Sequence, residues 1–275
     1  MPSIPTITLN DGAKIPVIGF GTGTALRDKD AAASVEQALK SGFTHIDAAQ
    51  IYNNESSVGA ALGASAVDRS QLYLTTKYGG GGTVSEEFHT SLSKLGVTSV
   101  DLYLIHHPQF VDKQGIEGAW ADVEKLQAAG LTTSIGVSNF SAAEVQRVLD
   151  SGKVTPSVNQ IRFHPYNYSS HKALLELCSK HSIVVEAFGI LAPITQSPGG
   201  AVTSVIESIA KRINGTPAQV LFKWALAKGV VVITTTNSQS RLDEYLAVLS
   251  LHLTETEVAA IDEAGALGVP ASGKA

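Results

Sequence analysis

The sequence predicts an α/β protein in which the chain forms one (β/α)8 TIM barrel, with an N-terminal β-hairpin that caps one end. The chain has 275 residues, and a single barrel of this class takes about 250 residues. Eight short apolar segments are each followed by a helical pattern. Most of them start roughly 24 to 33 residues apart, the length of a strand plus a crossover helix, which indicates parallel strands. We therefore expect a single domain over residues 1–275.

The elements can be assigned in order along the chain. Residues 6–17 alternate apolar and polar side chains around Asp11-Gly12, the signal of a tight β-hairpin. The barrel strands are expected at 17–22, 45–49, 72–77, 101–106, 134–139, 158–163, 184–189 and 230–235. The widest gap precedes the last strand. It is expected to hold a loop at 192–200 and two helical stretches, the second beginning at Thr216-Pro217 as N-cap and first turn.

Composition and charge exclude several classes of protein. Hydrophobic residues make up 44% of the chain and charged residues 16%, which is enough apolar material for a large core. The formal net charge of −5 leaves no basic field for nucleic acid or an anionic membrane. Residues 1–9 lack the pattern of a signal peptide, and no run reaches the roughly 18 apolar residues of a membrane span. We expect a soluble, cytoplasmic protein, and the single cysteine, Cys178, excludes an internal disulfide.

Four ionisable residues are expected at the C-terminal ends of neighbouring strands, where barrels of this kind carry their active sites. Asp47, Lys77 and His106 lie at the ends of three predicted strands, and Tyr52 follows Asp47 in a loop. Because a nearby ammonium favours a phenolate, we expect Lys77 to lower the pKa of Tyr52 and make it a usable acid. Asp47 would keep Lys77 cationic. His106 would orient a substrate oxygen or share its proton with Tyr52.

Each of these residues also has a structural explanation when it is taken alone. Asp47 could cap the next helix, Tyr52 could lie in a surface loop, and Lys77 could be a solvated strand end. His106 is followed by His107 and could belong to a strand-ending turn. The coincidence of four such residues at one end of the barrel favours the functional interpretation.

The same residues lie in motifs that resemble those of the aldo-keto reductases, the nicotinamide-dependent carbonyl reductases built on a (β/α)8 barrel. The resemblance covers nearly the whole chain, and its motifs are 18–22, 42–55, Lys77, 101–106, 136–140, Asn159-Gln160 and His164-Pro165. It implies a small carbonyl compound as substrate. It also implies a catalytic tetrad of Asp47, Tyr52, Lys77 and His106, in which the tyrosine protonates the carbonyl oxygen as hydride arrives.

The resemblance further implies a nicotinamide cofactor. Ser138, Asn139 and Gln160 would bond its carboxamide, and Phe188 stands where the family usually stacks a tyrosine on the ring. The expected cofactor-binding residues are Gly21, Thr22, Asp47, Ser138, Asn139, Gln160, Phe188, Gly189, Leu191, Thr234, Thr235, Thr236, Asn237, Ser238, Arg241, Glu244 and Tyr245. A Rossmann domain is not expected, because the alternating glycines at 19–23 lack the third glycine of the Gly-x-Gly-x-x-Gly pattern.

The turn after the eighth strand, 234–238, is rich in hydroxyl groups and leads into a helix with Arg241 in its first turns, which is typical of a phosphate site. On the residues alone it could also be a loop rich in helix-capping residues. Relatives often carry a lysine at Thr235 that helps to bind the adenosine 2′-phosphate, and an asparagine near the adenine at Tyr245. Arg241 keeps a guanidinium for a phosphate, so we favour NADPH, with NADH as an alternative.

The substrate pocket is expected to be wide. Many relatives line it with tryptophans, and the aligned positions here are Gly23, Gly79 and His107, which favours a bulky ketone or dicarbonyl. The expected substrate-binding residues are Gly23, Ile51, Gly79, His106 and His107. The glycine run 79–82 is either a flexible element of the site or a solvent-exposed linker. Because the family is often monomeric, we expect a monomer.

Three other functions stay open on the sequence. Lys77 could form a Schiff base in a lyase, although Asp47 should raise its pKa and oppose this. A metal hydrolase at His106-His107 is disfavoured, and no metal is expected, since adjacent residues of a strand point to opposite faces. A redox-sensing binding subunit would keep the barrel and bind the cofactor without turnover.

Overall fold

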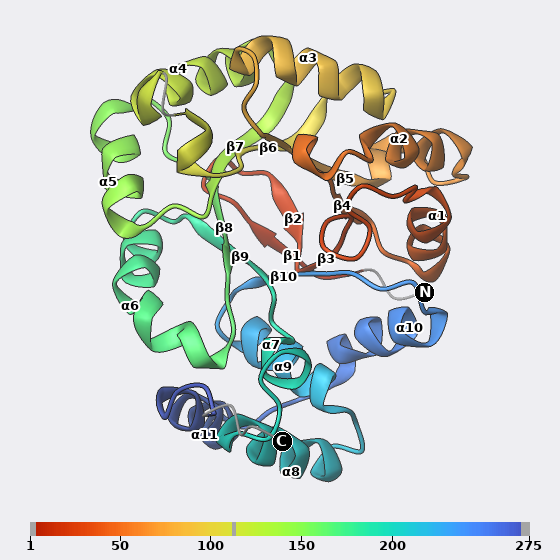
Figure 1. Cartoon of the computed structure of the whole chain (residues 1–275), viewed down its shortest axis with the longest axis vertical. Helices are drawn as coiled ribbons and strands as arrows, with labels where there is room; N and C mark the ends of the chain where they lie inside the picture. The colour runs from red at the N-terminus through yellow and green to blue at the C-terminus, as the bar shows by residue number, and fades with distance from the viewer. Residues whose placement is uncertain (1–3, 112–113, 271–275) are drawn as a thin grey trace.

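Eight parallel strands form a closed barrel in the computed structural model, which describes residues 4–111 and 114–270 (Figure 1). The strands are β3 (Ile18–Gly21), β4 (His45–Asp47), β5 (Tyr73–Tyr78), β6 (Val100–Ile105), β7 (Thr132–Ser138), β8 (Val158–Arg162), β9 (Val184–Phe188) and β10 (Val231–Thr234). Around the barrel they follow chain order, and β10 closes the circle against β3. This confirms the predicted fold class. The ends of the predicted domain, 1–3 and 271–275, lie outside the described residues.

Helices connect the strands and cover the outside of the barrel (Figure 1). They are α1 (Ala32–Ser41), α2 (Glu55–Ala64), α3 (Val84–Leu95), α4 (Gly115–Ala128), α5 (Ala142–Ser151), α6 (Pro165–Lys180), α7 (Ala192–Thr195), α8 (Ala201–Arg212), α9 (Pro217–Ala227), α10 (Gln239–Ala247) and α11 (Glu255–Ala266). Short 3-10 helices are η1 (Gln50–Tyr52), η2 (Arg69–Gln71), η3 (Pro108–Val111) and η4 (Val248–Ser250). Helix α9 begins as predicted, with the Thr216 hydroxyl accepting from Gln219 N and Pro217 in the first turn.

The N-terminal hairpin closes one end of the barrel. Strands β1 (Thr6–Thr8) and β2 (Lys14–Pro16) pair antiparallel around the predicted Asp11-Gly12 turn, where Gly12 has a φ of 89°. Leu9 and Ile15 are buried below the barrel. They pack against an interior apolar cluster made of Tyr73, Leu102, Leu104, Val158, Val231 and Ile233. Several of these are the first residues of their strands, so the hairpin covers the N-terminal end and the C-terminal end is left for a site.

A large apolar core fills the space between the barrel and the helices. Trp120 and Trp224 are both fully buried, and Trp224 stacks on Phe163 with ring centroids 5.1 Å apart. Each indole N–H has a partner: Trp120 donates to Val154 O at 3.1 Å and Trp224 to the Asp262 carboxylate at 2.7 Å. The two tryptophans therefore stabilise the fold by packing.

Two local expectations were wrong. The segment expected as a loop at 192–200 begins with helix α7, because Pro193 in its first turn already has the backbone angle of a helix. Tyr52 was expected in a loop but ends the 3-10 helix η1, where its N–H donates to Ala49 O at 3.0 Å. Asn53 stops this helix in the left-handed conformation, with a φ of 54°.

Candidate active site

Neighbouring strands carry the predicted ionisable residues to the open end of the barrel. Asp47 is the last residue of β4, Lys77 lies one residue before the end of β5, and His106 directly follows β6. Strands β4, β5 and β6 are paired in this order. The parallel register therefore brings the three side chains to one place, as the sequence predicted.

Lys77 is the centre of this group. Its side chain is completely buried, and its ammonium donates to Asp47 Oδ1 at 2.6 Å and to Ala48 O at 2.8 Å. Burial by itself lowers the pKa of a lysine, but the charge of Asp47 and its hydrogen bond oppose this, and the pKa of Lys77 lies above its ordinary value. The Asp47 carboxylate thus favours the cationic form of Lys77.

Tyr52 faces Lys77 from η1. Its hydroxyl lies 3.4 Å from Lys77 Nζ, which also sits 5.0 Å from the centroid of the phenol ring. Lys77 lowers the pKa of Tyr52, as expected, but not enough to bring it below its usual value. Burial raises the pKa of this phenol, the Lys77 charge opposes the rise in part, and Asp47 adds to it. Tyr52 is therefore protonated at neutral pH, with a proton to give and a cation beside it.

His106 lies on the other side of the phenol. The two rings meet edge to face with centroids 5.4 Å apart. Burial, with the nearby Lys77 charge, lowers the pKa of His106 to about 2. Its Nδ1 has no hydrogen-bond partner among the described residues. His106 is thus a neutral imidazole that can donate or accept one hydrogen bond at the mouth of the barrel.

A cluster of amides and a hydroxyl lies next to this group. Ser138 Oγ donates to Gln160 O at 2.8 Å, and Asn139 Nδ2 donates to His106 O and to Ser138 Oγ, both at 3.0 Å. Gln160 Nε2 donates to Asp47 Oδ2 at 2.8 Å. Asn139 takes a left-handed φ of 60° just after β7, which turns its side chain back toward the site. These polar groups fit the carboxamide expected there.

The backbone around Asp47 and the end of β9 completes this side of the opening. Gly21 pairs with Asp47 across β3 and β4, and Thr22 N donates to Asp47 O at 2.9 Å. Phe188 ends β9 half-buried, in a position to stack on a flat ring. Gly189 follows it with a left-handed φ of 72°.

The predicted phosphate turn lies between β10 and α10. Thr234 and Thr236 are buried, and Thr235 has a buried hydroxyl with no partner among the described residues. Helix α10 starts after Ser238, and the Ser238 side chain accepts no hydrogen bond from the first N–H groups of the helix. Arg241, in the first turn, is exposed and makes no salt bridge within 4–111 and 114–270. Open N–H groups, a spare hydroxyl and a free guanidinium fit an anionic phosphate.

Two of the expected cofactor residues are held by the neighbouring helix α9. Glu244 Oε1 accepts from the Thr216 hydroxyl at 2.5 Å. Tyr245 is 3% exposed and packs its ring edge against Phe222, with centroids 4.9 Å apart. The Tyr245 ring thus belongs to the core in this structure.

The glycines at the expected substrate pocket are in close contact with η1. A Cβ at Gly79 would overlap Ile51 Cγ2, and one at Gly23 would lie 2.8 Å from Tyr52 Cζ. Both approaches are well below normal carbon contacts. At these two positions the space of a larger side chain is therefore taken up by η1, and less volume opens there than the aligned tryptophans suggested.

A residue that the sequence did not single out, Gln50, fastens the glycine run 79–82. Gln50 Oε1 accepts from Gly79 N at 2.7 Å. Its Nε2 donates to Gly80 O at 2.9 Å and to the Glu87 carboxylate at 2.6 Å. The run is thus tied to the same short helix that carries Tyr52. A polar residue beside the tetrad motif was the only sequence signal for this contact.

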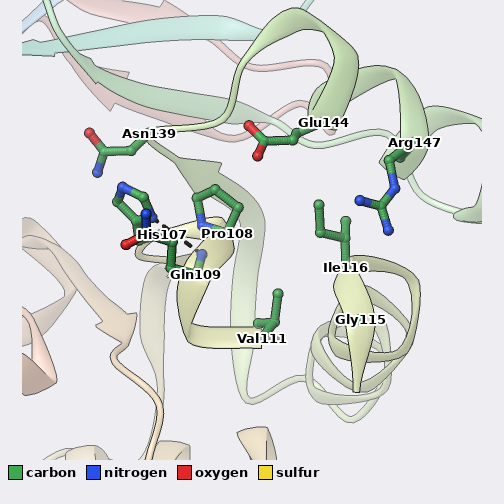
Figure 2. A pocket seen from close by; sticks show the side chains of 9 residues that line it. All are labelled: His107, Pro108, Gln109, Val111, Gly115, Ile116, Asn139, Glu144 and Arg147. Carbon is green, nitrogen blue, oxygen red and sulfur yellow. Dashed lines mark hydrogen bonds between the residues drawn. The ribbon is translucent and has the colours of Figure 1, made fainter. Parts of the chain in front are cut away.

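A cavity of about 500 Å³ adjoins the site (Figure 2). It is lined by His107, Pro108, Gln109, Val111, Gly115, Ile116, Asn139, Glu144 and Arg147. His107 and Asn139 lie together at one side of it, and Arg147 at the other (Figure 2). Arg147 makes two bonds to Glu117, at 2.8 and 3.0 Å, so its charge is already balanced. The cavity is therefore polar without being strongly cationic.

The described residues contain no cluster of three or more His, Cys, Asp or Glu side chains that could hold a metal ion. Their helices are all too short or too polar to cross a membrane. A barrel whose open end combines a protonated phenol, a buried lysine and an amide cluster fits an oxidoreductase that works with a nicotinamide cofactor.

Comparisons with known proteins agree with this class. The sequence model described as the Aldo/keto reductase family matches residues 17–266. The chain is 40% identical to the NAD/NADP-dependent indole-3-acetaldehyde reductase of Schizosaccharomyces pombe, over 94% of this chain and 93% of that protein. It is 36% identical to the NADPH-dependent alpha-keto amide reductase of Saccharomyces cerevisiae, over 94% and 90%. The crystal structure of a Bombyx mori aldo-keto reductase in complex with NADP superposes with a TM-score of 0.87 at 28% identity, over 96% of this chain and 93% of that one. The chain belongs to the aldo/keto reductase family.

Proposed function

We propose that the protein reduces a carbonyl compound to an alcohol, with hydride from NADPH and a proton from Tyr52. The observation that carries this proposal is the row of buried Asp47, buried Lys77 and half-buried Tyr52, in which the ammonium lies 2.6 Å from the carboxylate and 3.4 Å from the phenol. When bound, the nicotinamide supplies the hydride. Tyr52 donates its proton to the carbonyl oxygen as negative charge grows there, and Lys77 stabilises the phenolate that is left. His106 hydrogen-bonds the same oxygen and holds it near the phenol.

The preference for NADPH rests on the turn that starts α10. Arg241 and the unpartnered Thr235 hydroxyl offer a cation and a donor to an adenosine 2′-phosphate, a group that NADH lacks. NADH stays a usable cofactor, because Ser138, Asn139 and Gln160 bind a part that both cofactors share. One relative is itself named as NAD/NADP-dependent.

A bulky carbonyl compound is the substrate class we propose. The cavity beside His107 and Asn139 gives about 500 Å³ for the part of the substrate away from the carbonyl. Two relatives are named for substrates larger than simple aldehydes, indole-3-acetaldehyde and an alpha-keto amide.

We also propose that the barrel and hairpin together form one domain over 1–275.

NADPH oxidation measured against a panel of small aldehydes, bulky ketones and α-dicarbonyls tests the proposal. We expect turnover with the larger members, and a loss of about 100-fold or more in kcat for Tyr52→Phe, with NADPH binding kept. Cofactor binding without turnover on any member would instead support a binding subunit. Borohydride trapping of a substrate on Lys77 would support a Schiff-base lyase, which the raised pKa of Lys77 opposes.

A further inference from the structure

Glu186 is a fully buried acid that the proposed proton transfer does not use. It lies in β9 between Val185 and Ala187, in the middle of an apolar strand. Its Oε2 accepts from Gln160 Nε2 at 3.1 Å. Its Oε1 has no hydrogen-bond partner among the described residues, and His45 Nε2 lies 3.8 Å from it. Burying such an acid is costly, which favours a role for its hydrogen bond with Gln160.

That contact is with the amide expected to face the nicotinamide. Gln160 and Glu186 are direct partners in the register of β8 and β9. Gln160 Nε2 shares its two hydrogens between Asp47 Oδ2, at 2.8 Å, and Glu186 Oε2, at 3.1 Å. A hydrogen bond to one acceptor determines which end of an amide faces the barrel interior, and a hydrogen bond to a second acceptor determines the orientation of the amide plane. Gln160 Oε1 then points away from both carboxyl groups, as an acceptor for a ligand N–H.

The charges around Glu186 are compatible with this role. Burial, and then the negative charge of Asp47, raises the pKa of Glu186 to about 8, so it is mainly neutral at pH 7. His45, on the adjacent side, is also neutral, because burial lowers its pKa to about 4. Lys77 and Asp47 balance one another. A neutral carboxyl still accepts a hydrogen bond through its carbonyl oxygen, so the contact with Gln160 is kept without a second buried negative charge.

We infer that Glu186 is a positioning residue which, together with Asp47, sets the plane of the Gln160 amide and thereby the orientation of the cofactor's nicotinamide carboxamide. This inference rests on the proposed function. Glu186 acts through Gln160 and touches neither cofactor nor substrate.

Two variants separate the length of the Glu186 side chain from its acid group. Glu186→Asp keeps the acid but withdraws its oxygens by about 1.5 Å, one carbon–carbon bond, away from Gln160. Glu186→Gln keeps the reach and an accepting oxygen but removes the acid. Glu55→Asp is the matched control, because Glu55 is equally buried and accepts from Thr76 Oγ1 at 2.7 Å, with no bond to Gln160.

Isothermal titration calorimetry of each variant with NADPH, and with 2′-phospho-ADP-ribose, which lacks the nicotinamide, is the test. For Glu186→Asp we expect the Kd of NADPH to rise about 3- to 10-fold, the worth of one net hydrogen bond, with the Kd of 2′-phospho-ADP-ribose unchanged. Glu186→Gln should restore the wild-type Kd of NADPH, and Glu55→Asp should leave both values unchanged.

Equal losses for both ligands, or an unchanged Kd of NADPH in Glu186→Asp, would overturn the inference. The inference would also be overturned if Glu186→Gln bound NADPH as weakly as Glu186→Asp, because the acid group, and not the length of the side chain, would then matter. Failure of the wild-type protein to bind NADPH at all would instead overturn the proposed function, so the two failures are distinguishable.

Discussion

Adding one methyl group at Gly79 should slow the reaction through a steric contact with Ile51. A Cβ there would overlap Ile51 Cγ2. Because carbon atoms in contact are about 3.5–4.0 Å apart, the two must separate by about 1 Å. Gly79 is not among the residues with positive φ, so alanine causes no backbone strain. Ile51 directly precedes Tyr52 in η1. Because a misplacement of about 1 Å can cost 100-fold, we expect Gly79→Ala to lower kcat/KM by about 10- to 100-fold.

Steady-state kinetics of a small set of variants isolates this contact. Ile51→Ala removes Cγ2, so the double variant with Gly79→Ala should recover most of the loss, measured against Ile51→Ala alone. Ile51→Val keeps a methyl group there and should not rescue. Gly63→Ala is the control for alanine itself, since an added Cβ in α2 meets nothing within 4 Å. It should keep activity and gain up to about 1 kcal/mol of stability. Wild-type kcat/KM in Gly79→Ala would refute the steric reasoning.

Three further outcomes are expected. Lys77→Met leaves the Asp47 carboxylate buried without its cationic partner. Urea denaturation should therefore show a loss of about 3–5 kcal/mol in the free energy of unfolding, partly restored by Asp47→Asn. An unchanged midpoint of unfolding would contradict this. The pKa of Glu186 is about 8 in the folded protein against an ordinary 4.5, so its contribution to stability is complete below pH 4.5 and is lost as the pH rises through 8. The pKa of His45 is lowered from 6.5 to about 4, so its contribution to stability is complete above pH 6.5 and is lost as the pH falls through 4. The Tm from differential scanning fluorimetry should therefore fall on both sides of weakly acidic pH, and Glu186→Gln should remove the alkaline fall but not the acidic one. Arg241→Ala should raise the Kd of NADPH about 10-fold in fluorescence titrations and leave that of NADH nearly unchanged, and an equal loss for both would exclude a role in 2′-phosphate binding.

The barrel and the place of the tetrad could be predicted because both depend on spacing along the chain. Strand starts at regular intervals require crossover connections, and parallel strands carry their last residues to one end. Asp47, Lys77 and His106 therefore meet for a reason that is visible in the order of residues.

The remaining features of the site depend on distances that no local pattern contains. The pKa of Tyr52 is a balance between burial and the Lys77 charge, and burial prevails. The close contact of Ile51 with Gly79 arises only when η1 packs on the end of β5. Glu186 was readable in part, because an acid inside an apolar strand is itself a signal, but its partner Gln160 is determined by the register of β8 and β9.

The hairpin beneath the barrel also bears on how protons would travel in the proposed reaction. Leu9 and Ile15 cover the lower end of the barrel with buried apolar side chains, and Asp47 and Lys77 lie at the opposite end. In the proposed reaction, a proton that replaces the one given by Tyr52 would then enter through the upper mouth, where cofactor and substrate would also enter. With both bound, we expect reprotonation of Tyr52 to wait for product to leave. Solvent isotope effects on kcat should therefore follow product release as well as chemistry.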